Sequence, residues 1–247
     1  MKRLLQYATV ILVCISMSGF SQEEVSAQSF SGNAAISFSS NYVWRGQKLS
    51  SGTVSQPTVG LSYKGFNMNL WSNFSNKDSE TTETDFTASY SFDASTASFD
   101  IGYINYAFDG FKDTQEFYGA VGFNVLLSPA ATFYYDFDEG KGGFLVASIG
   151  HSIAFSESIS LDLGLSGSMN FNNGIMGLNA NGEEFTGLYN ADISAAMTVP
   201  LFDAVSLVPY AAYSLPLSDD AETAIKSISF DGDSEIFYGG IGFSLDL

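Results

Sequence analysis

Residues 158–171 read SISLDLGLSGSMNF, and this stretch decides the fold class. Every second residue from Ile159 to Phe171 is apolar except Gly167, and the positions between them are serine, aspartate, glycine or asparagine. Successive side chains of a β-strand point to opposite faces, so the pattern predicts a strand with one apolar and one polar face. At roughly 3.3 Å per residue the strand exceeds the ~25 Å apolar band of an outer-membrane barrel. Strands of soluble sheets usually span only about 5–6 residues, so the stretch favours a transmembrane barrel wall.

The N-terminal residues 1–27 have the features of a secretory signal peptide. Lys2 and Arg3 precede an apolar run over residues 7–17, and Val25-Ser26-Ala27 is a small-residue cleavage pattern. The apolar run is shorter than the about 20 residues that a membrane-spanning helix needs. We therefore expect an exported chain whose mature part, residues 28–247, is a single barrel domain without cysteine, because Cys14 leaves with the signal peptide.

The charge balance excludes one class of partner. The formal net charge is −18, and removal of residues 1–27 leaves it unchanged because two basic and two acidic residues are lost together. Arg45 is the only arginine after the signal peptide. A nucleic-acid-binding protein needs a basic face, so no nucleic-acid partner is expected.

Alternating segments continue along the mature chain, from a first strand over about residues 31–45 to a last strand over residues 235–247. We count twelve strands, with ten or fourteen as alternatives. The connections near residues 64, 94, 128, 156 and 202 are short, and those near 50, 79, 111, 140, 179 and 225 are mostly longer and more polar. Short periplasmic turns and longer extracellular loops are typical of an all-β, antiparallel, up-and-down transmembrane barrel in the bacterial outer membrane. A soluble β-sandwich is the structural alternative.

Aromatic residues near the predicted strand ends fall on the outward parity. Such rings form girdles where the apolar wall meets lipid headgroups. The predicted girdle residues are Tyr42, Trp44, Tyr63, Phe74, Phe86, Phe133, Phe171 and Tyr189. Core-filling aromatics are the alternative interpretation.

Charged residues collect on the inward parity, where a wet lumen tolerates them. The predicted lumen and pore-mouth charges are Arg45, Asp85, Glu116, Asp136, Asp100, Asp162 and Asp192. Arg45, Asp85, Glu116 and Asp136 fall near the outer-loop ends of their strands, where carboxylates would favour cations over anions. Solvated charges without a role in transport are the alternative.

The residues do not indicate an enzyme. His151 is the only histidine and shares the parity of the outward residues Leu145, Ala147 and Ile149, away from any polar nucleophile. With one histidine and no mature cysteine, no metal or cofactor is expected. Acidic residues between 219 and 233 lack the spacing of an EF-hand loop.

Two motifs carry a family resemblance. The first, Ser40-Asn41-Tyr42-Val43-Trp44-Arg45-Gly46, resembles the signature that opens the TorF-like porins of bacterial outer membranes. The second is the C-terminal strand, where Tyr238, Gly240, Phe243, Leu245 and Leu247 resemble the signal that the barrel-assembly machinery reads, although Leu247 stands where phenylalanine is commonest. The resemblance implies a signal peptide, a barrel of about a dozen strands and a pore function, with the signature arginine at Arg45.

The sequence thus leads us to expect an outer-membrane channel for passive diffusion of small hydrophilic solutes, with a preference for cations. Its expected partners are outer-membrane lipid, the barrel-assembly machinery and those solutes. One alternative is a non-conducting barrel whose acidic loops, 172–186 and 216–234, bind a partner or stabilise the envelope. A barrel-embedded hydrolase that uses His151 is a further alternative.

Overall fold

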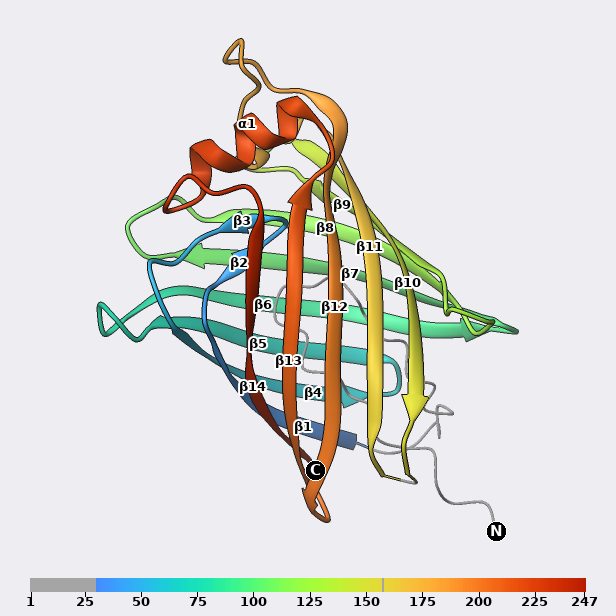
Figure 1. The fold of residues 1–247 in the computed structure, drawn as a ribbon. Helices are drawn as coiled ribbons and strands as arrows, with labels where there is room; N and C mark the ends of the chain where they lie inside the picture. Colours follow the sequence, from blue (N-terminus) through green and yellow to red (C-terminus); the bar gives the residue numbers. More distant parts are fainter. Residues whose placement is uncertain (1–29, 157) are drawn as a thin grey trace.

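The computed structural model describes residues 30–156 and 158–247, which form one closed antiparallel barrel of twelve strands (Figure 1). The predicted signal peptide, residues 1–27, lies outside the described residues. The wall strands in order of pairing are β1 (Phe30–Ser39), β4 (Val54–Tyr63), β5 (Phe66–Ser75), β6 (Glu80–Ala94), β7 (Ala97–Phe108), β8 (Thr114–Phe123), β9 (Ala130–Asp136), β10 (Gly142–Ala154), β11 (Ser160–Phe171), β12 (Thr186–Phe202), β13 (Val205–Pro216) and β14 (Ile236–Asp246). Strand β14 pairs with β1, which closes the barrel and confirms the predicted strand number.

The alternation of the sequence becomes an apolar outer face and a polar inner face. On β11, Leu163 and Leu165 are 41% and 46% exposed, whereas the neighbouring Ser166 and Ser168 are each 6% exposed. The same arrangement recurs on β4 and β14, where Leu61 and Ile241 are exposed on the outside. A single closed sheet with its apolar side outward is the reverse of a soluble β-sandwich, whose two sheets bury their apolar faces against each other.

The connections are sorted between the two ends of the barrel. The three long ones, 40–53, 172–185 and 217–235, all lie at the extracellular end, opposite the C-terminus (Figure 1). The periplasmic turns include 64–65, 95–96 and 203–204. The sorting is not strict, because the periplasmic turn 124–129 is longer than the extracellular loop 76–79.

The first predicted strand is too long at its C-terminal end. Strand β1 ends at Ser39, and residues 40–53 leave the wall and form a small hairpin of β2 (Val43–Trp44) and β3 (Gln47–Lys48). Arg45 and Gly46 form its tip with φ angles of 50° and 80°. These left-handed conformations reverse the chain, so the alternation up to residue 45 belongs to two separate pieces of β-structure.

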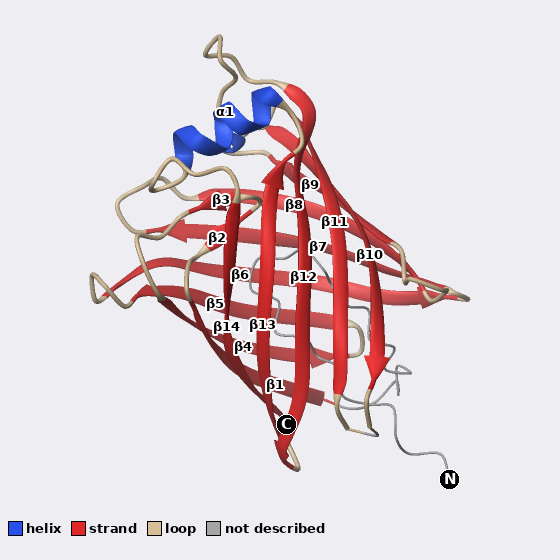
Figure 2. Ribbon diagram, in the orientation of Figure 1, coloured by secondary structure: helices blue, strands red, loops and turns tan. Residues whose placement is uncertain are grey.

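The last extracellular loop contains a helix where the sequence pattern predicts only a loop. Helix α1 (Asp219–Ile228) lies across the extracellular end of the barrel (Figure 2), and the side chain of Ser218 caps it by accepting a hydrogen bond from the Ala221 amide. The loop 172–185 contributes one short 3-10 helix, η1 (Gly174–Met176). In residues 30–156 and 158–247, no helix has the length and apolar character needed to cross a membrane.

Strand β12 carries a β-bulge close to its extracellular end. Gly167 pairs with Ala191 and Met169 pairs with Leu188, so two residues of β12, Tyr189 and Asn190, oppose one residue of β11. Because the extra residue changes the parity of the strand, Tyr189 turns into the barrel and is fully buried.

Candidate functional site at the barrel mouth

The hairpin β2–β3 crosses the mouth of the barrel from one wall to the opposite wall. In the ring of twelve strands, β9 lies six steps from β1 in either direction, so the two strands face each other. The hairpin leaves the wall after β1 and returns at β4, yet its tip residue Arg45 lies over the ring of Tyr134 on β9. The loop therefore spans the full width of the lumen at its extracellular end.

Arg45 ends in a buried ion pair with the wall. Its Nη1 and Nη2 atoms donate to the two carboxylate oxygens of Glu116 on β8 at 2.8 and 2.7 Å, and the two side chains are only 6% and 1% exposed. The Tyr106 hydroxyl on β7 donates a further 2.9 Å hydrogen bond to Glu116. Burial lowers the pKa of Arg45, but the Glu116 carboxylate together with Tyr106 and Tyr134 raises it, so the pKa lies above its ordinary value and the group stays charged.

Aromatic rings surround the guanidinium. Its central carbon lies 4.4 Å from the ring centre of Trp44, 4.5 Å from that of Phe144 and 4.6 Å from that of Tyr134. Such distances are typical of cation–π contacts, which are strongest where water is excluded. Of these rings, Phe144 and Tyr134 belong to the wall and Trp44 to the hairpin.

The remaining residues of the hairpin contact other parts of the wall. Val43 packs in a buried cluster with Ala212 on β13 and with Ile236 and Tyr238 on β14. The ring centre of Tyr42 lies 5.5 Å from that of Trp71 on β5. Gln47 also contacts Tyr189 on β12. The loop that carries the hairpin therefore contacts β5, β12, β13 and β14 in addition to the strands around Arg45.

Polar contacts join the hairpin to the other two long loops. The Gln47 side chain donates to the Tyr189 hydroxyl at 2.9 Å, and that hydroxyl donates to the Met176 carbonyl in η1 at 2.7 Å. The backbone amide of Lys48 donates to the Ser229 hydroxyl at 3.1 Å, and the Lys48 side chain forms an ion pair with Asp231. Loops 40–53, 172–185 and 217–235 thus form one interlocked cover over the mouth.

The buried face of α1 completes this cover. Ala221, Ala224 and Ile225 of the helix pack in one apolar cluster with Met176 and Phe185. Phe144, Val146 and Tyr189 belong to the same cluster, so wall strands β10 and β12 support the helix from below. The sequence signal that could have indicated this packing is the apolar side chains on the inward parity of β10, the weakest alternating segment.

Asp136 does not serve as an open charge at the mouth. Its carboxylate accepts hydrogen bonds from the Thr114 hydroxyl at 2.7 Å and from the backbone amides of Asp138 and Gly140 at 2.9 and 3.0 Å. The side chain is 1% exposed, so it holds the loop 137–141 against β8. These donors are all neutral and leave the charge in place, but the carboxylate is buried beneath the loop and is not exposed at the mouth.

Three predicted lumen carboxylates accept hydrogen bonds from neutral donors only. Asp100 accepts from Ser91 at 2.6 Å and from Tyr118, and Asp162 accepts from Ser160 at 3.3 Å. Asp192 accepts from Asn190 at 2.9 Å and from Ser166 at 3.3 Å. Neutral partners leave the negative charge of each group uncompensated.

Asp85 is a fourth inward carboxylate, on β6. Its Oδ1 atom is buried and has no hydrogen-bond partner in the described part of the chain. No lysine or arginine occurs on any of the twelve wall strands. At Glu116 the inner face is paired with a cation because Arg45 reaches it from the loop 40–53.

The predicted aromatic girdle divides into two groups. Five of its residues lie on the outward parity, namely Tyr63, Phe74, Phe86 and Phe133, which are all exposed, and Phe171, which is half-buried and contacts Phe133. The other three predictions are wrong. Tyr42 and Trp44 belong to the inserted loop, and the bulge in β12 turns Tyr189 inward.

The predicted assembly-signal residues lie on or just beyond β14, at the seam where the barrel closes. Tyr238 is buried and faces the lumen, and Phe243 is exposed on the outside. Gly240 is required here, because a Cβ atom would lie 2.0 Å from the Phe38 carbonyl oxygen. Leu245 pairs with Ala34 across the seam, and the Leu247 amide donates to the Gly32 carbonyl at 2.8 Å.

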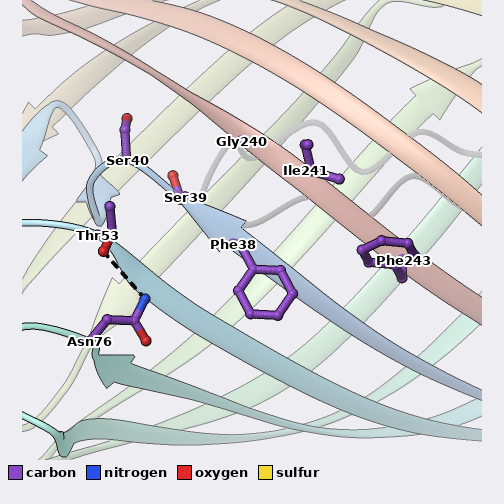
Figure 3. A pocket seen from close by; sticks show the side chains of 8 residues that line it. All are labelled: Phe38, Ser39, Ser40, Thr53, Asn76, Gly240, Ile241 and Phe243. Carbon is purple, nitrogen blue, oxygen red and sulfur yellow. Dashed lines mark hydrogen bonds between the residues drawn. The ribbon is translucent and has the colours of Figure 1, made fainter.

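A shallow groove runs along the outer face of this seam. Figure 3 shows its apolar side chains, Phe38, Ile241 and Phe243, to the right of a polar end where Asn76 donates to Thr53 at 3.5 Å. The groove lies on the outward, exposed parity and is therefore part of the face that meets lipid.

His151 lies on the outer face of β10 and is exposed, opposite Leu163 on β11. A hydrolase site would need this imidazole within hydrogen-bond reach of a nucleophile in an enclosed site. No group of three or more histidine, cysteine, aspartate or glutamate side chains among the described residues could hold a metal ion.

The closed antiparallel fold and its apolar outer face define a barrel of the outer-membrane type. The chain matches no model of a known protein family and no curated protein sequence. Among solved structures, it is similar to the KdgM porin in complex with disordered oligogalacturonate, with a TM-score of 0.52, 11% identity, and coverage of 88% of this chain and 99% of that chain.

Two further structures show the same fold. The NanC porin gives a TM-score of 0.54 at 10% identity, over 88% of this chain and 100% of that chain. The COG4313 outer membrane channel from Pseudomonas putida F1 gives 0.51 at 10% identity, over 92% and 100%. At these identities the likeness concerns the fold of the barrel.

Proposed function

We propose that this protein is a porin-like channel of the bacterial outer membrane, through which small hydrophilic solutes diffuse with a preference for cations. One observation carries the preference: the inner face presents Asp100, Asp162 and Asp192, and the wall strands contain no basic residue. A low-dielectric wall with charges of one sign raises the local concentration of counter-ions. Acidic rings are the usual device of cation-selective pores.

The similar barrels support a porin-like function, but the ligand named for one of them differs in charge from the solutes that we propose for this chain. They are named as porins and channels, and one of them was crystallised with oligogalacturonate, which is a polyanion. A polyanion would meet uncompensated carboxylates in the present lumen. We therefore propose neutral or cationic solutes for this chain.

The apolar outer belt supports a place in the outer membrane, reached through the predicted signal peptide 1–27. The resemblance of residues 40–46 to the TorF-like porin signature and of β14 to the assembly signal supports the same biogenesis. In this proposal the barrel-assembly machinery recognises β14 through its outward and terminal residues, among them Phe243 and Leu247.

One observation favours a second candidate, a non-conducting barrel that presents its loops. Loops 40–53, 172–185 and 217–235 interlock through the Lys48–Asp231 ion pair and the apolar cluster under α1. A permanently closed cover would serve as a surface for a partner outside the cell. The two candidates differ in whether ions pass.

The test is the reversal potential of the refolded mature chain in a planar bilayer with a salt gradient. We expect discrete conductance steps and a cation-selective reversal potential, and a variant with Asp100, Asp162 and Asp192 all changed to Asn should move that potential towards zero. A matched control changes three exposed loop acids instead, Asp109→Asn, Glu183→Gln and Asp219→Asn. An unchanged reversal potential in the lumen variant contradicts the cation preference, and silent insertion of all three proteins favours the second candidate.

A further inference from the structure

The cage around the Arg45 guanidinium is built almost entirely by the wall. Glu116 on β8 supplies both carboxylate oxygens, and Tyr106 on β7 orients that carboxylate with its hydroxyl. Tyr134 on β9 and Phe144 on β10 supply aromatic rings within 4.6 Å of the guanidinium carbon. These four side chains belong to four adjacent strands, and Trp44 of the hairpin adds one ring from the loop side.

The chemistry of this cage selects a planar, forked cation. Two parallel N–H···O bonds to one carboxylate match the geometry of a guanidinium, which an ammonium group cannot reproduce. The rings of Tyr134 and Phe144 lie at cation–π distance from the same carbon atom. Because Glu116 is 1% exposed, an empty cage would leave a buried carboxylate without a countercharge, which is unfavourable in general.

Arg45 occupies the cage as a group attached to a loop. It lies at the tip of the hairpin with a φ angle of 50°, a left-handed conformation that is unfavourable for a non-glycine residue. A tethered group competes with free solutes at an effective concentration on the order of millimolar. A free guanidinium has to reach at least this concentration to displace it, because Val43, Gln47 and Lys48 also hold the hairpin.

We propose that the Glu116–Tyr134–Phe144 cage is a binding site for guanidinium-bearing solutes, and that Arg45 is its intramolecular occupant and keeps the mouth closed. A solute with a guanidinium group exchanges with Arg45, the tip of loop 40–53 is released from the far wall, and the lumen opens. The binding half of this proposal, that the cage binds guanidinium groups, does not depend on the proposed channel function. The opening half, that this exchange opens the lumen, rests on the proposed channel function.

The binding half is tested by calorimetric titration of methylguanidinium chloride into the refolded protein in detergent micelles. The Arg45→Ala variant, whose cage is vacant, should bind methylguanidinium at least tenfold more tightly than the wild type, where Arg45 competes. Methylammonium has the same charge without the fork and should bind the variant at least tenfold more weakly. The double variant Arg45→Ala/Glu116→Gln should lose the binding. Equal affinity of the variant for both cations would overturn the proposal.

The opening half is tested on the wild type, which avoids any folding defect of the variants. Methylguanidinium at millimolar concentration should increase the open fraction in planar bilayers several-fold, and methylammonium at the same ionic strength should not. The control variant Lys48→Ala loosens the loop at its Asp231 contact while leaving the cage occupied, so it should keep the methylguanidinium response.

The results separate the two proposals. Binding to the Arg45→Ala variant in a protein that never conducts supports the cage and overturns the channel. Conductance without selective binding of methylguanidinium supports the channel and overturns the cage. A wild-type channel that responds equally to both cations overturns the opening mechanism.

Discussion

Gln47 in the first extracellular loop and Tyr189 in the bulge of β12 are joined by a 2.9 Å hydrogen bond inside the barrel mouth. The Tyr189 hydroxyl in turn donates to the Met176 carbonyl at 2.7 Å. All three residues are buried, and none of these contacts is local in sequence. One phenolic oxygen thereby joins three separate segments of the chain.

Replacing Tyr189 with Phe should destabilise the folded barrel by about 1–3 kcal/mol, because the buried Gln47 amide and Met176 carbonyl each lose a partner. The shape of the side chain is retained, so the loss reports hydrogen bonding rather than packing. The measurement is the urea dependence of unfolding from lipid vesicles. Tyr135→Phe, at an exposed position on the outer face, is the control and should leave the unfolding midpoint unchanged.

The substitution Gly46→Ala should loosen the hairpin tip. Gly46 has a φ angle of 80°, and a Cβ atom would lie 3.0 Å from the Cβ atom of Asn190. Gly110→Ala is a matched control, because Gly110 has a φ angle of 77° and a Cβ atom added there would meet no other atom within 4 Å. The two variants share the conformational cost of about 1 kcal/mol, and only Gly46→Ala adds the contact.

Limited digestion with trypsin measures the difference, since Arg45 and Lys48 lie in this hairpin. We expect cleavage in the loop to be several-fold faster in Gly46→Ala than in Gly110→Ala. Equal rates would show that the contact with Asn190 does not hold the hairpin in place.

Removing the carboxylate of Asp136 should free the loop 137–141. The variant Asp136→Ala loses three hydrogen bonds to a charged acceptor, and we expect a cost of about 2–3 kcal/mol. Amide exchange at Asp138 and Gly140 should accelerate, whereas Asp138→Ala should leave the exchange at Gly140 slow. Preserved protection of both amides in Asp136→Ala would contradict the bracing role.

A charge on the outer face should be costly if this face meets lipid. Leu165 lies near the middle of β11 and is exposed, so Leu165→Arg should destabilise the barrel by about 2–4 kcal/mol in vesicles. Phe111→Arg places the same side chain in an exposed extracellular loop and should change stability by less than about 0.5 kcal/mol. A similar small effect at both positions would contradict the transmembrane assignment of the belt.

The barrel fold could be predicted from the sequence because the alternation that indicates it lies within single segments of the chain. A strand with one lipid face and one lumen face repeats every two residues, and this period can be read in segments such as 158–171 without knowledge of any partner strand. The twelve strands, their closure and the inward parity of Asp85, Asp100, Glu116, Asp162 and Asp192 follow from that period.

The bulge in β12 could not be predicted from the alternation of the sequence. One inserted residue reverses the parity beyond it, so Tyr189 faces the lumen although the alternation places it outside. Leu188 and Tyr189 are both apolar, so this change of parity does not show in the alternation, and the bulge is recognised only from the pairing with β11.

What the sequence by itself determined is the barrel, its two faces and the acidic character of the inner one, because each depends on a period of two residues. What only the tertiary structure decided is the bridge across the mouth, where Arg45 pairs with Glu116 on the far side of the lumen. That pair joins residues 71 positions apart, and it exists because closure of twelve strands brings β8 to β10 to the wall opposite β1. Contacts across a closed ring depend on the geometry of the whole ring, which no single segment of the chain contains.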